Sequence, residues 1–213
     1  MRNICLTIVL SFASAALAAP PKHVEIAYEI ARNDLVLAEV TQRLEHDGHS
    51  YKLLETWKGK GAFALRGEAA RTSVGAIAAD GLRPQKFEDK RSGKETRQVD
   101  FDPAAATPTP LRQDRLSFIW TFAFAPPTGP VTVSVADGKG VTSYTYEPAG
   151  RERVKTPAGE FNALKLVKRR DNPQDRATEI WLATDRNYLP VRLLVVDKDG
   201  TRLDTLVSKI FVK

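Results

Sequence analysis

Alternation between apolar and polar residues is the dominant pattern of this chain. All the even positions of residues 24–30 are apolar, which is typical of a strand with one buried face. Similar segments recur as far as residues 203–212, and turn sequences such as Asp-Gly and Asn-Asp separate them. Because short turns join antiparallel neighbours, we predict roughly ten or more mainly antiparallel strands.

One segment has a helical period instead. Residues 114–124 (DRLSFIWTFAF) begin with Asp114, a suitable N-cap, and are followed by two prolines that end a helix. The apolar residues fall on more than one side of this helix: Leu116, Ile119 and Trp120 on one face, Phe118 and Phe122 elsewhere. Such a helix is usually buried on two sides. A weaker signal predicts a helical turn within residues 62–70.

These elements together predict a mainly β (α+β) fold. A long, twisted antiparallel sheet tends to curl, so we expect a curled sheet or half-open β-barrel with one or two helices packed on its concave side. An ordinary two-sheet sandwich is the alternative. The loop at residues 102–110 is rich in Pro and Ala, but strands resume soon after it. We therefore expect residues 19–213 to form a single domain and a monomer.

The first residues of the chain, MRNICLTIVLSFASAALAA, have the features of a secretory signal peptide. Arg2 is followed by an apolar run of about 14 residues and by Ala16-Leu17-Ala18, a small-x-small cleavage pattern. We expect residues 1–18 to be removed on export, and a periplasmic location if the cell is Gram-negative. Cleavage also removes Cys5, the only cysteine, so no disulfide is expected.

The charge balance is moderately basic, with a formal net charge of +6. Basic residues cluster within residues 86–94, 151–155 and 165–170, but acidic residues lie in or beside each cluster. Solvated sheet faces are the simplest interpretation, and peripheral contact with anionic membrane lipids is the functional one. The chain has no motif of the kind that reads bases, so we expect no nucleic acid partner.

No recognisable catalytic or metal-binding constellation is present. His46 and His49 lie on a predicted hairpin turn, and the sequence offers them no obvious third or fourth ligand. Gly59-Lys60-Gly61 lacks the rest of a phosphate-binding loop, and Glu88-Asp89 is read as salt-bridged surface. We therefore expect no enzymatic activity, no catalytic residues, no metal and no cofactor.

Five short motifs occur in a fixed order along the chain. They are DGLRP at residues 80–84, DRLS at residues 114–117 before Trp120, VKTPAGEF at residues 154–161, IWLA at residues 180–183 and YLPVR at residues 188–192. As an ordered set behind a signal peptide, they resemble the bacterial domain-of-unknown-function 3108 family. The resemblance implies an envelope protein with a fold like that of the periplasmic lipoprotein carriers, and it implies no catalytic residues. Each motif also has a structural interpretation, since Thr-Pro-x-Gly suits a tight turn.

Aromatic and aliphatic residues near the predicted helix are the best candidates for a ligand site. A cavity between the curled sheet and the helix would be lined by Trp57, Phe63, Leu116, Phe118, Trp120 and Phe122. The alternative is that these residues simply fill the core. Our leading hypothesis is a non-enzymatic periplasmic protein that binds a lipid or an acyl chain. An envelope scaffold with a protein partner is the second hypothesis, and a hydrolase of envelope polymers is the third.

Overall fold

The computed structural model of the chain describes residues 19–102 and 111–213; residues 1–18, the expected signal peptide, and residues 103–110 of the Pro- and Ala-rich loop lie outside that description. The described residues form a 13-stranded sheet, one 3₁₀ helix, η1 (Gly61–Arg66), and one α-helix, α1 (Ser117–Phe124). The strands are β1 (His23–Arg32), β2 (Leu35–His46), β3 (Ser50–Gly59), β4 (Ala69–Ala78), β5 (Gly81–Arg91), β6 (Arg97–Asp100), β7 (Leu111–Asp114), β8 (Val131–Ala136), β9 (Val141–Thr156), β10 (Gly159–Lys168), β11 (Ala177–Ala183), β12 (Leu189–Val196) and β13 (Arg202–Val212).

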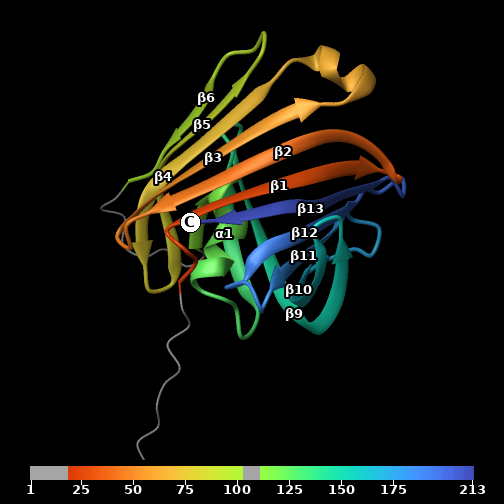
Figure 1. The fold of residues 1–213 in the computed structure, drawn as a ribbon. Coiled ribbons are helices and arrows are strands. Elements are labelled where there is room, and N and C mark those ends of the chain that lie inside the picture. Colours follow the sequence, from red (N-terminus) through yellow and green to blue (C-terminus); the bar gives the residue numbers. More distant parts are fainter. Residues whose placement is uncertain (1–18, 103–110) are drawn as a thin grey trace, which may run out of the picture.

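The sheet curls into a nearly closed barrel around α1 (Figure 1). Its strand order is β6-β5-β4-β3-β2-β1-β13-β12-β11-β10-β9-β8-β7, so the two chain termini meet in the middle of the sheet. The two edges of the sheet approach each other. The edge strand β7 contacts β5, which is the neighbour of the other edge strand, β6: the side-chain amide of Gln113 donates to the backbone oxygen of Leu82 at 2.7 Å. The prediction of a mainly β, half-open barrel with a helix inside is confirmed.

The edge strand β7 departs from the expected antiparallel pattern. It pairs in parallel with β8, with Leu111 opposite Val133. Parallel neighbours need a crossover of a dozen or more residues, and here the segment that contains α1 supplies it. The pattern of residues 114–124 predicts a helix that begins at Asp114, whereas Asp114 is the last residue of β7 and α1 begins at Ser117.

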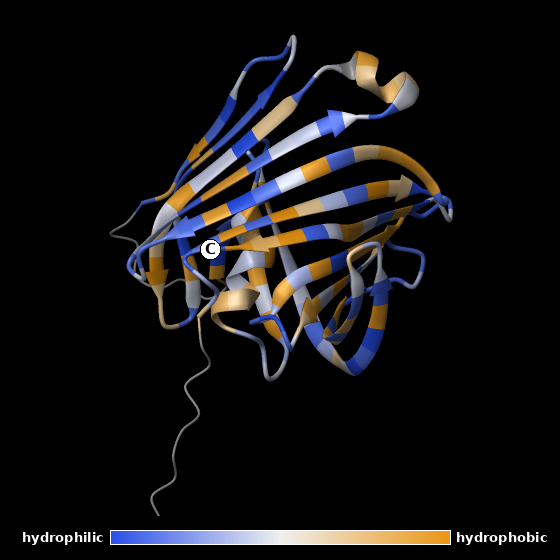
Figure 2. Cartoon of the chain, viewed as in Figure 1, coloured by the Kyte–Doolittle hydropathy of each residue, from blue (hydrophilic) through white to orange (hydrophobic). Residues whose placement is uncertain are grey.

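Two apolar clusters fill the barrel on different sides of α1. Leu116 and Trp120 join the larger cluster, with residues of β1 to β5 and of β9 to β13, whereas Phe122 joins the smaller one, with β8 to β11. Strand β11 is buried on both faces, since Ile180 belongs to the smaller cluster and Trp181 to the larger. Figure 2 shows the alternation of hydrophobic and hydrophilic residues along the strands that produces these faces. The helix is thus buried on two sides, as its pattern predicts.

The start of α1 is held by a buried network around Asp114. The carboxylate of Asp114 accepts the backbone N–H groups of Leu116 and Ser117, both at 2.8 Å, and thus caps the chain just before the helix. It also accepts the hydroxyl of Ser73 at 2.5 Å, which in turn lies 2.9 Å from the hydroxyl of Tyr51. Burial raises the pKa of Asp114, although these hydrogen bonds act to lower it. The network ties the helix to β3 and β4.

Candidate functional site

A row of polar side chains crosses the concave face of the sheet below α1. Gln42, Glu55, Arg71 and Asp89 are direct cross-strand partners on β2, β3, β4 and β5. Partners in antiparallel strands project from the same face, and Asp89 pairs in the same way with Arg97 on β6. The row separates the apolar core around Trp120 from the other half of the concave face.

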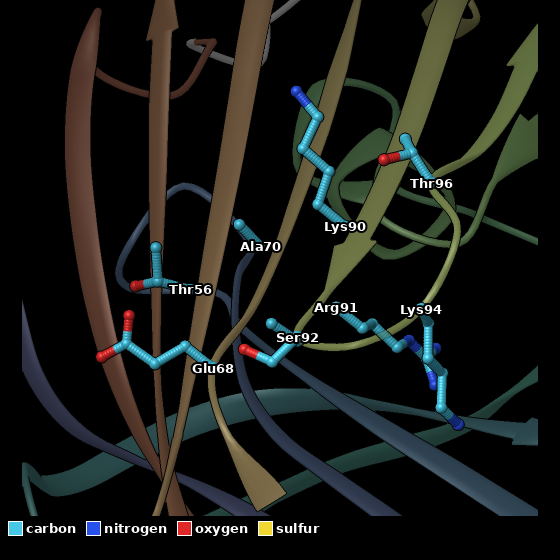
Figure 3. Close-up of a pocket in the computed structure, with 9 residues that line it drawn as sticks. Thr56, Glu68, Ala70, Lys90, Arg91, Ser92, Lys94 and Thr96 are labelled. Atoms are coloured by element: carbon cyan, nitrogen blue, oxygen red, sulfur yellow. The ribbon is translucent and has the colours of Figure 1, made fainter.

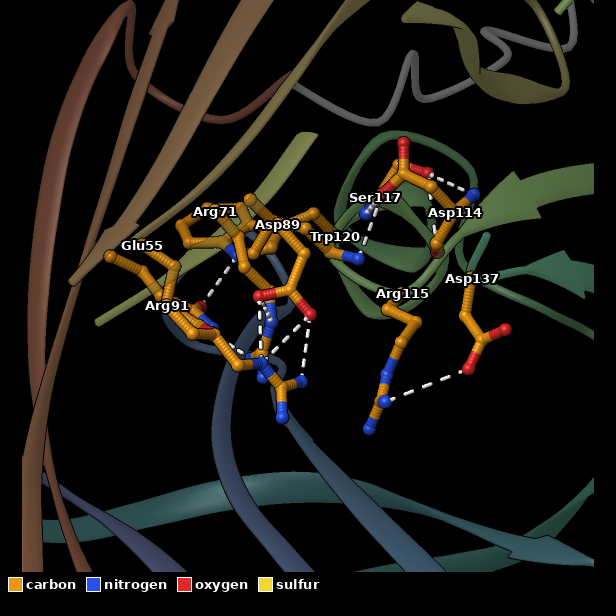
Figure 4. Close-up of polar contacts among 11 residues, drawn as sticks. Glu55, Arg71, Asp89, Arg91, Asp114, Arg115, Ser117, Trp120 and Asp137 are labelled. Carbon is orange, nitrogen blue, oxygen red and sulfur yellow. Dashed lines mark hydrogen bonds and ion pairs between the residues drawn. The ribbon is translucent and has the colours of Figure 1, made fainter. Parts of the chain in front are cut away.

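Hydrogen bonds and ion pairs connect this row from end to end (Figure 4). The indole N–H of Trp120 donates to the Gln42 side-chain oxygen at 2.7 Å, and the Gln42 amide donates to Glu55 at 2.7 Å. Glu55 pairs with Arg71, whose Nε lies 3.5 Å from a carboxylate oxygen of Asp89. Helix α1 is therefore linked to four strands through one polar chain.

Asp89 is the buried centre of the charged part of this row. Its side chain is only 1% exposed, and Arg91 donates to it through Nε and through Nη2, the latter at 2.7 Å. Burial alone would raise the pKa of Asp89, but the Arg91 hydrogen bond and the charges of Arg71 and Arg91 outweigh it and lower the pKa. The interpretation of Glu88-Asp89 as surface is wrong for Asp89, because its side chain points into the barrel. It holds for Glu88, which pairs with lysines on either side of it.

Arg115 lies beside this group at the beginning of the helical segment. Its Nη1 is 3.7 Å from a carboxylate oxygen of Asp137, which is longer than a hydrogen bond, and its side chain is 46% exposed. Partial burial and then the charge of Arg71 lower the pKa of Arg115. The guanidinium group of Arg115 thus faces other cations and has weak protein pairing.

On β1 and β13, burial of the concave face decreases from Tyr28 and Val207 toward one end of the barrel. On β13, Val207 is buried, Thr205 is half-buried and Leu203 is 36% exposed. On β1, burial decreases in the same direction: Tyr28 is buried and Ile30 is half-buried. Cross-strand pairing places Ile30 opposite Thr205, so both strands show the same gradient. The end of the barrel beside α1 is therefore closed. We call the end that is less covered on these two strands the open end, although Ala38 on β2, which also pairs with Ile30, is buried.

Exposed apolar side chains surround the open end. Leu35 and Leu203 both pair with Arg32, two residues beyond Ile30, and Leu35 is 67% exposed. Helix η1 packs against β2 and β3 at the same end, and its Leu65 is 92% exposed. Figure 1 shows the β1–β2 turn and the coil of η1 at this end, and Figure 2 shows hydrophobic residues in both. We call Leu35, Leu65 and Leu203 the apolar rim.

The six residues that the sequence predicts as a ligand site fall into separate places. Leu116 and Trp120 are buried in the larger cluster, and Phe122 is buried in the smaller one. Phe118 packs against the smaller cluster, and its ring stacks on Tyr146 at 6.2 Å between centroids. The helix residues therefore pack the interior on two sides and do not line one space. The prediction that they contact a ligand stays untested.

The other two predicted residues lie toward the open end. Trp57 on β3 shares the concave face with Val40 and Ala69, its cross-strand partners, and it is half-buried. Phe63 lies in η1 and is also half-buried. The structure thus places Trp57 and Phe63 near the apolar rim and away from the core around Trp120.

Two open depressions on the described part of the chain lie elsewhere, and neither is lined by any of these six residues. The first, of about 260 Å³, lies at the ends of β4 and β5 (Figure 3). It is lined by Thr56, Glu68, Ala69, Ala70, Lys90, Arg91, Ser92, Lys94 and Thr96. The second, of about 410 Å³, is lined by Arg176, Asp197, Lys198 and Asp199 near the β12–β13 turn. Both have strongly charged walls, unlike the apolar cavity that the sequence predicts.

Several of the five short motifs have structural roles in the fold. Trp181 of IWLA and Arg192 of YLPVR are cross-strand partners, and the Arg192 guanidinium lies 4.5 Å from the indole centroid. Arg192 also pairs with Asp204 through two hydrogen bonds of 2.9 and 2.6 Å. In VKTPAGEF, the backbone N–H of Ala158 donates to the Val207 oxygen on β13. These residues hold strands β9 to β13 together.

The described residues show no group of three or more potential metal ligands among His, Cys, Asp and Glu side chains. His49 is exposed, whereas His46 packs edge-on against Phe124 at 5.3 Å between ring centroids, so it is less exposed than a turn residue would be. Among the described helices, none has the length and apolar character needed to cross a membrane.

Comparisons with known proteins give a family and a set of distant structural neighbours. A family model described as "Protein of unknown function (DUF3108)" matches residues 26–207. No curated protein matches the chain. Among solved structures, a β-barrel-like DUF1849 protein from Brucella abortus shows 8% identity and a TM-score of 0.48, with 91% of this chain and 99% of that chain covered.

Two further structures show a weaker likeness. A candidate lipoprotein from Parabacteroides distasonis shows 9% identity and a TM-score of 0.42, with 92% of this chain and 98% of that chain covered. MucB in complex with MucA(peri) shows 16% identity and a TM-score of 0.37, with 88% and 49% covered. At these identities and TM-scores, the likeness carries no inference about what the present chain binds.

Proposed function

This chain belongs to the DUF3108 family of proteins of unknown function, and from its own geometry we propose that it binds an amphipathic, lipid-like ligand at the open end of the barrel. The apolar part of the ligand lies along the concave face beside Trp57 and Ile30 and passes between the residues of the apolar rim. The role is binding without catalysis. The signal pattern in residues 1–18 supports an exported protein that acts in the cell envelope.

The gradient of burial along the concave face is the observation that carries this proposal. A barrel that only needed a core would cover its inner apolar residues, yet Ile30 and Trp57 remain half-buried and Leu203 is exposed. Exposed apolar patches on a protein surface mark sites of interaction. The closed end, where Trp120 is fully buried, offers a ligand no comparable surface.

The free energy of such an interaction comes mainly from burial of the acyl chain. Each CH₂ group removed from water contributes about 0.8 kcal/mol, so an alkyl chain of moderate length binds without any charged contact. The ligand also covers rim side chains such as Leu65, which is almost fully exposed in the free protein. Both contributions favour a complex at this end of the barrel.

The alternative function, an envelope scaffold that docks through its basic strands, has less support. Lys165 pairs with Glu179 at 2.8 Å, and Arg169 pairs with Glu147. Lys155 similarly lies 3.4 Å from Glu160. Because acidic neighbours already pair with these three cations, they offer a partner little free charge.

The proposal is tested with protein purified from the periplasm and a double variant at the open end, Trp57→Ala with Leu203→Ser. Native mass spectrometry is expected to show co-purified or added single-chain lipid on the wild type and its loss from this variant. Phe211→Ser is the matched control, since Phe211 is 56% exposed at the opposite end of the same strand. Equal lipid uptake by both variants would contradict the proposal, as would a wild type that takes up no lipid.

A further inference from the structure

We infer that the ligand carries an anionic headgroup, a phosphate or a carboxylate, which Arg91 and Arg115 bind at the inner end of the open region. This inference rests on the proposed function for the apolar part of the ligand and adds the chemical class of its polar part.

The first argument is the number of guanidinium donors around Asp89. Four arginines (Arg71, Arg91, Arg97 and Arg115) lie close to three carboxylates (Glu55, Asp89 and Asp137). Glu55 already accepts from Gln42 and Arg71, and Asp89 accepts three hydrogen bonds from Arg91. The group therefore holds an excess of one positive charge and more N–H donors than acceptors.

The second argument is the state of Arg115. A guanidinium group has five N–H donors, and within the described residues its one acidic contact, Asp137, lies 3.7 Å away. The neighbouring charges of Arg71 and Arg91 also lower the pKa of Arg115, after partial burial. A bound anion would accept hydrogen bonds from Arg115 and reduce the repulsion among the three cations.

The third argument is access from solvent. The side chains of Arg91 and Arg115 are 31% and 46% exposed, whereas the carboxylate between them, Asp89, is buried. Figure 4 shows Arg71 and Arg91 grouped around Asp89, with the Arg115 guanidinium directed away from Asp114. The cationic atoms thus face space that a small anion reaches.

The fourth argument is the distance to the apolar wall. Trp57, Ala69 and Arg91 are successive cross-strand partners on β3, β4 and β5. Since neighbouring strands lie about 4.8 Å apart, Trp57 and Arg91 are about 10 Å apart on one face. A single-chain amphipath spans this distance, with its headgroup at Arg91 and its alkyl chain along Trp57 toward the apolar rim.

The test measures binding of decyl phosphate, decanol and inorganic phosphate to the full mature chain by isothermal titration calorimetry. Decyl phosphate is expected to bind more tightly than decanol, and this advantage should decrease at high salt. Arg115→Gln is expected to weaken decyl phosphate binding by about tenfold, since the headgroup loses a charge-assisted hydrogen bond, and to leave decanol binding unchanged. Arg91→Lys, which keeps a cation over Asp89, provides a second variant.

The control is Arg153→Gln, because Arg153 is an exposed arginine on β9, 3.9 Å from Glu160. Equal affinities for decyl phosphate and decanol in wild type and variants would overturn the anionic headgroup and leave the proposed function standing. Inorganic phosphate that binds as tightly as decyl phosphate would overturn it in favour of a free anion. Failure of both alkyl ligands to bind would refute the proposed function itself.

Discussion

The two ends of the barrel use the same kinds of residue for different purposes. At the closed end, Trp120 and Phe122 are fully buried between two apolar clusters, and Asp114 is enclosed in hydrogen bonds. At the open end, Trp57 is only half-buried and Leu203 is exposed on the same concave face. Aromatic residues alone therefore do not identify a ligand site in this fold. What distinguishes a core residue from a candidate ligand contact is whether other parts of the protein cover its side chain.

The polar row from Gln42 to Asp89 is the boundary between these two ends. It joins Trp120 on one side, and on the other it lies next to the row that contains Trp57 and Arg91. Charged groups at this depth are stable only because each is paired. The predictions that follow separate the stability of the closed end from the binding capacity of the open end.

The largest effect is expected for Trp120→Ala. Removal of a fully buried aromatic side chain should lower the free energy of unfolding by about 3–5 kcal/mol, because it leaves a cavity. The matched change at the open end, Trp57→Ala, should cost less than about 2 kcal/mol, since that side chain is only partly buried. Urea unfolding of both variants measures the difference. Similar costs would mean that the two ends are packed alike.

A smaller loss is expected for Asp114→Ala. The variant removes a cap and leaves the Ser73 hydroxyl and two backbone N–H groups without their acceptor, which should cost about 2–3 kcal/mol. Asp199→Ala is the control, because its carboxylate accepts a similar backbone bond from Thr201 in an exposed turn. Thermal unfolding should separate the two variants clearly. An equal shift in Tm would show that the network around α1 has no special importance.

Asp89→Asn should lower stability by about 1–3 kcal/mol at neutral pH, since Arg71 and Arg91 lose their anionic partner. The pKa of Asp89 is lowered in the folded state, so its contribution is complete above the unfolded value of about 3.9. It is lost as the pH falls through the lower folded value. Urea unfolding at neutral pH and near pH 3 should therefore show a difference between wild type and variant that shrinks in acid. A difference that is constant with pH would contradict this ionisation state.

The strands and the buried helix follow from the sequence because period-two alternation and helical spacing depend on local residues. The pairing of β7 with β8 does not, since no local pattern distinguishes a parallel edge strand of four residues from a loop. The polar row was also missed. A two-residue Asp47-Gly48 turn would pair Gln42 with Leu53, whereas the observed turn pairs His46 with Tyr51 and therefore Gln42 with Glu55. The pairing of Arg71 with Asp89 cannot be predicted from the position of the β4–β5 turn either, because a bulge between Val74 and Gly75 shifts the register of β4 against β5.

The candidate site was predicted less well than the fold, for a physical reason. Hydrophobicity indicates that Phe122 and Trp57 avoid water, but it does not indicate whether protein or ligand covers them. Phe122 is covered by Tyr146, whose ring lies 6.1 Å away, whereas Trp57 faces the less covered half of the concave face. Such coverage depends on the curl of the whole sheet, which is set by bulges and long-range pairing.

The most direct test of the open-end site is a two-dimensional NMR titration that follows the indole N–H signals of the three tryptophans. Decyl phosphate, added below its critical micelle concentration, should shift the Trp57 signal. It should leave the signals of Trp120 and Trp181 in place, because these indoles are buried and donate to Gln42 and Glu152. A shift of the Trp120 signal with Trp57 unchanged would place the ligand beside the helix and contradict the proposed site.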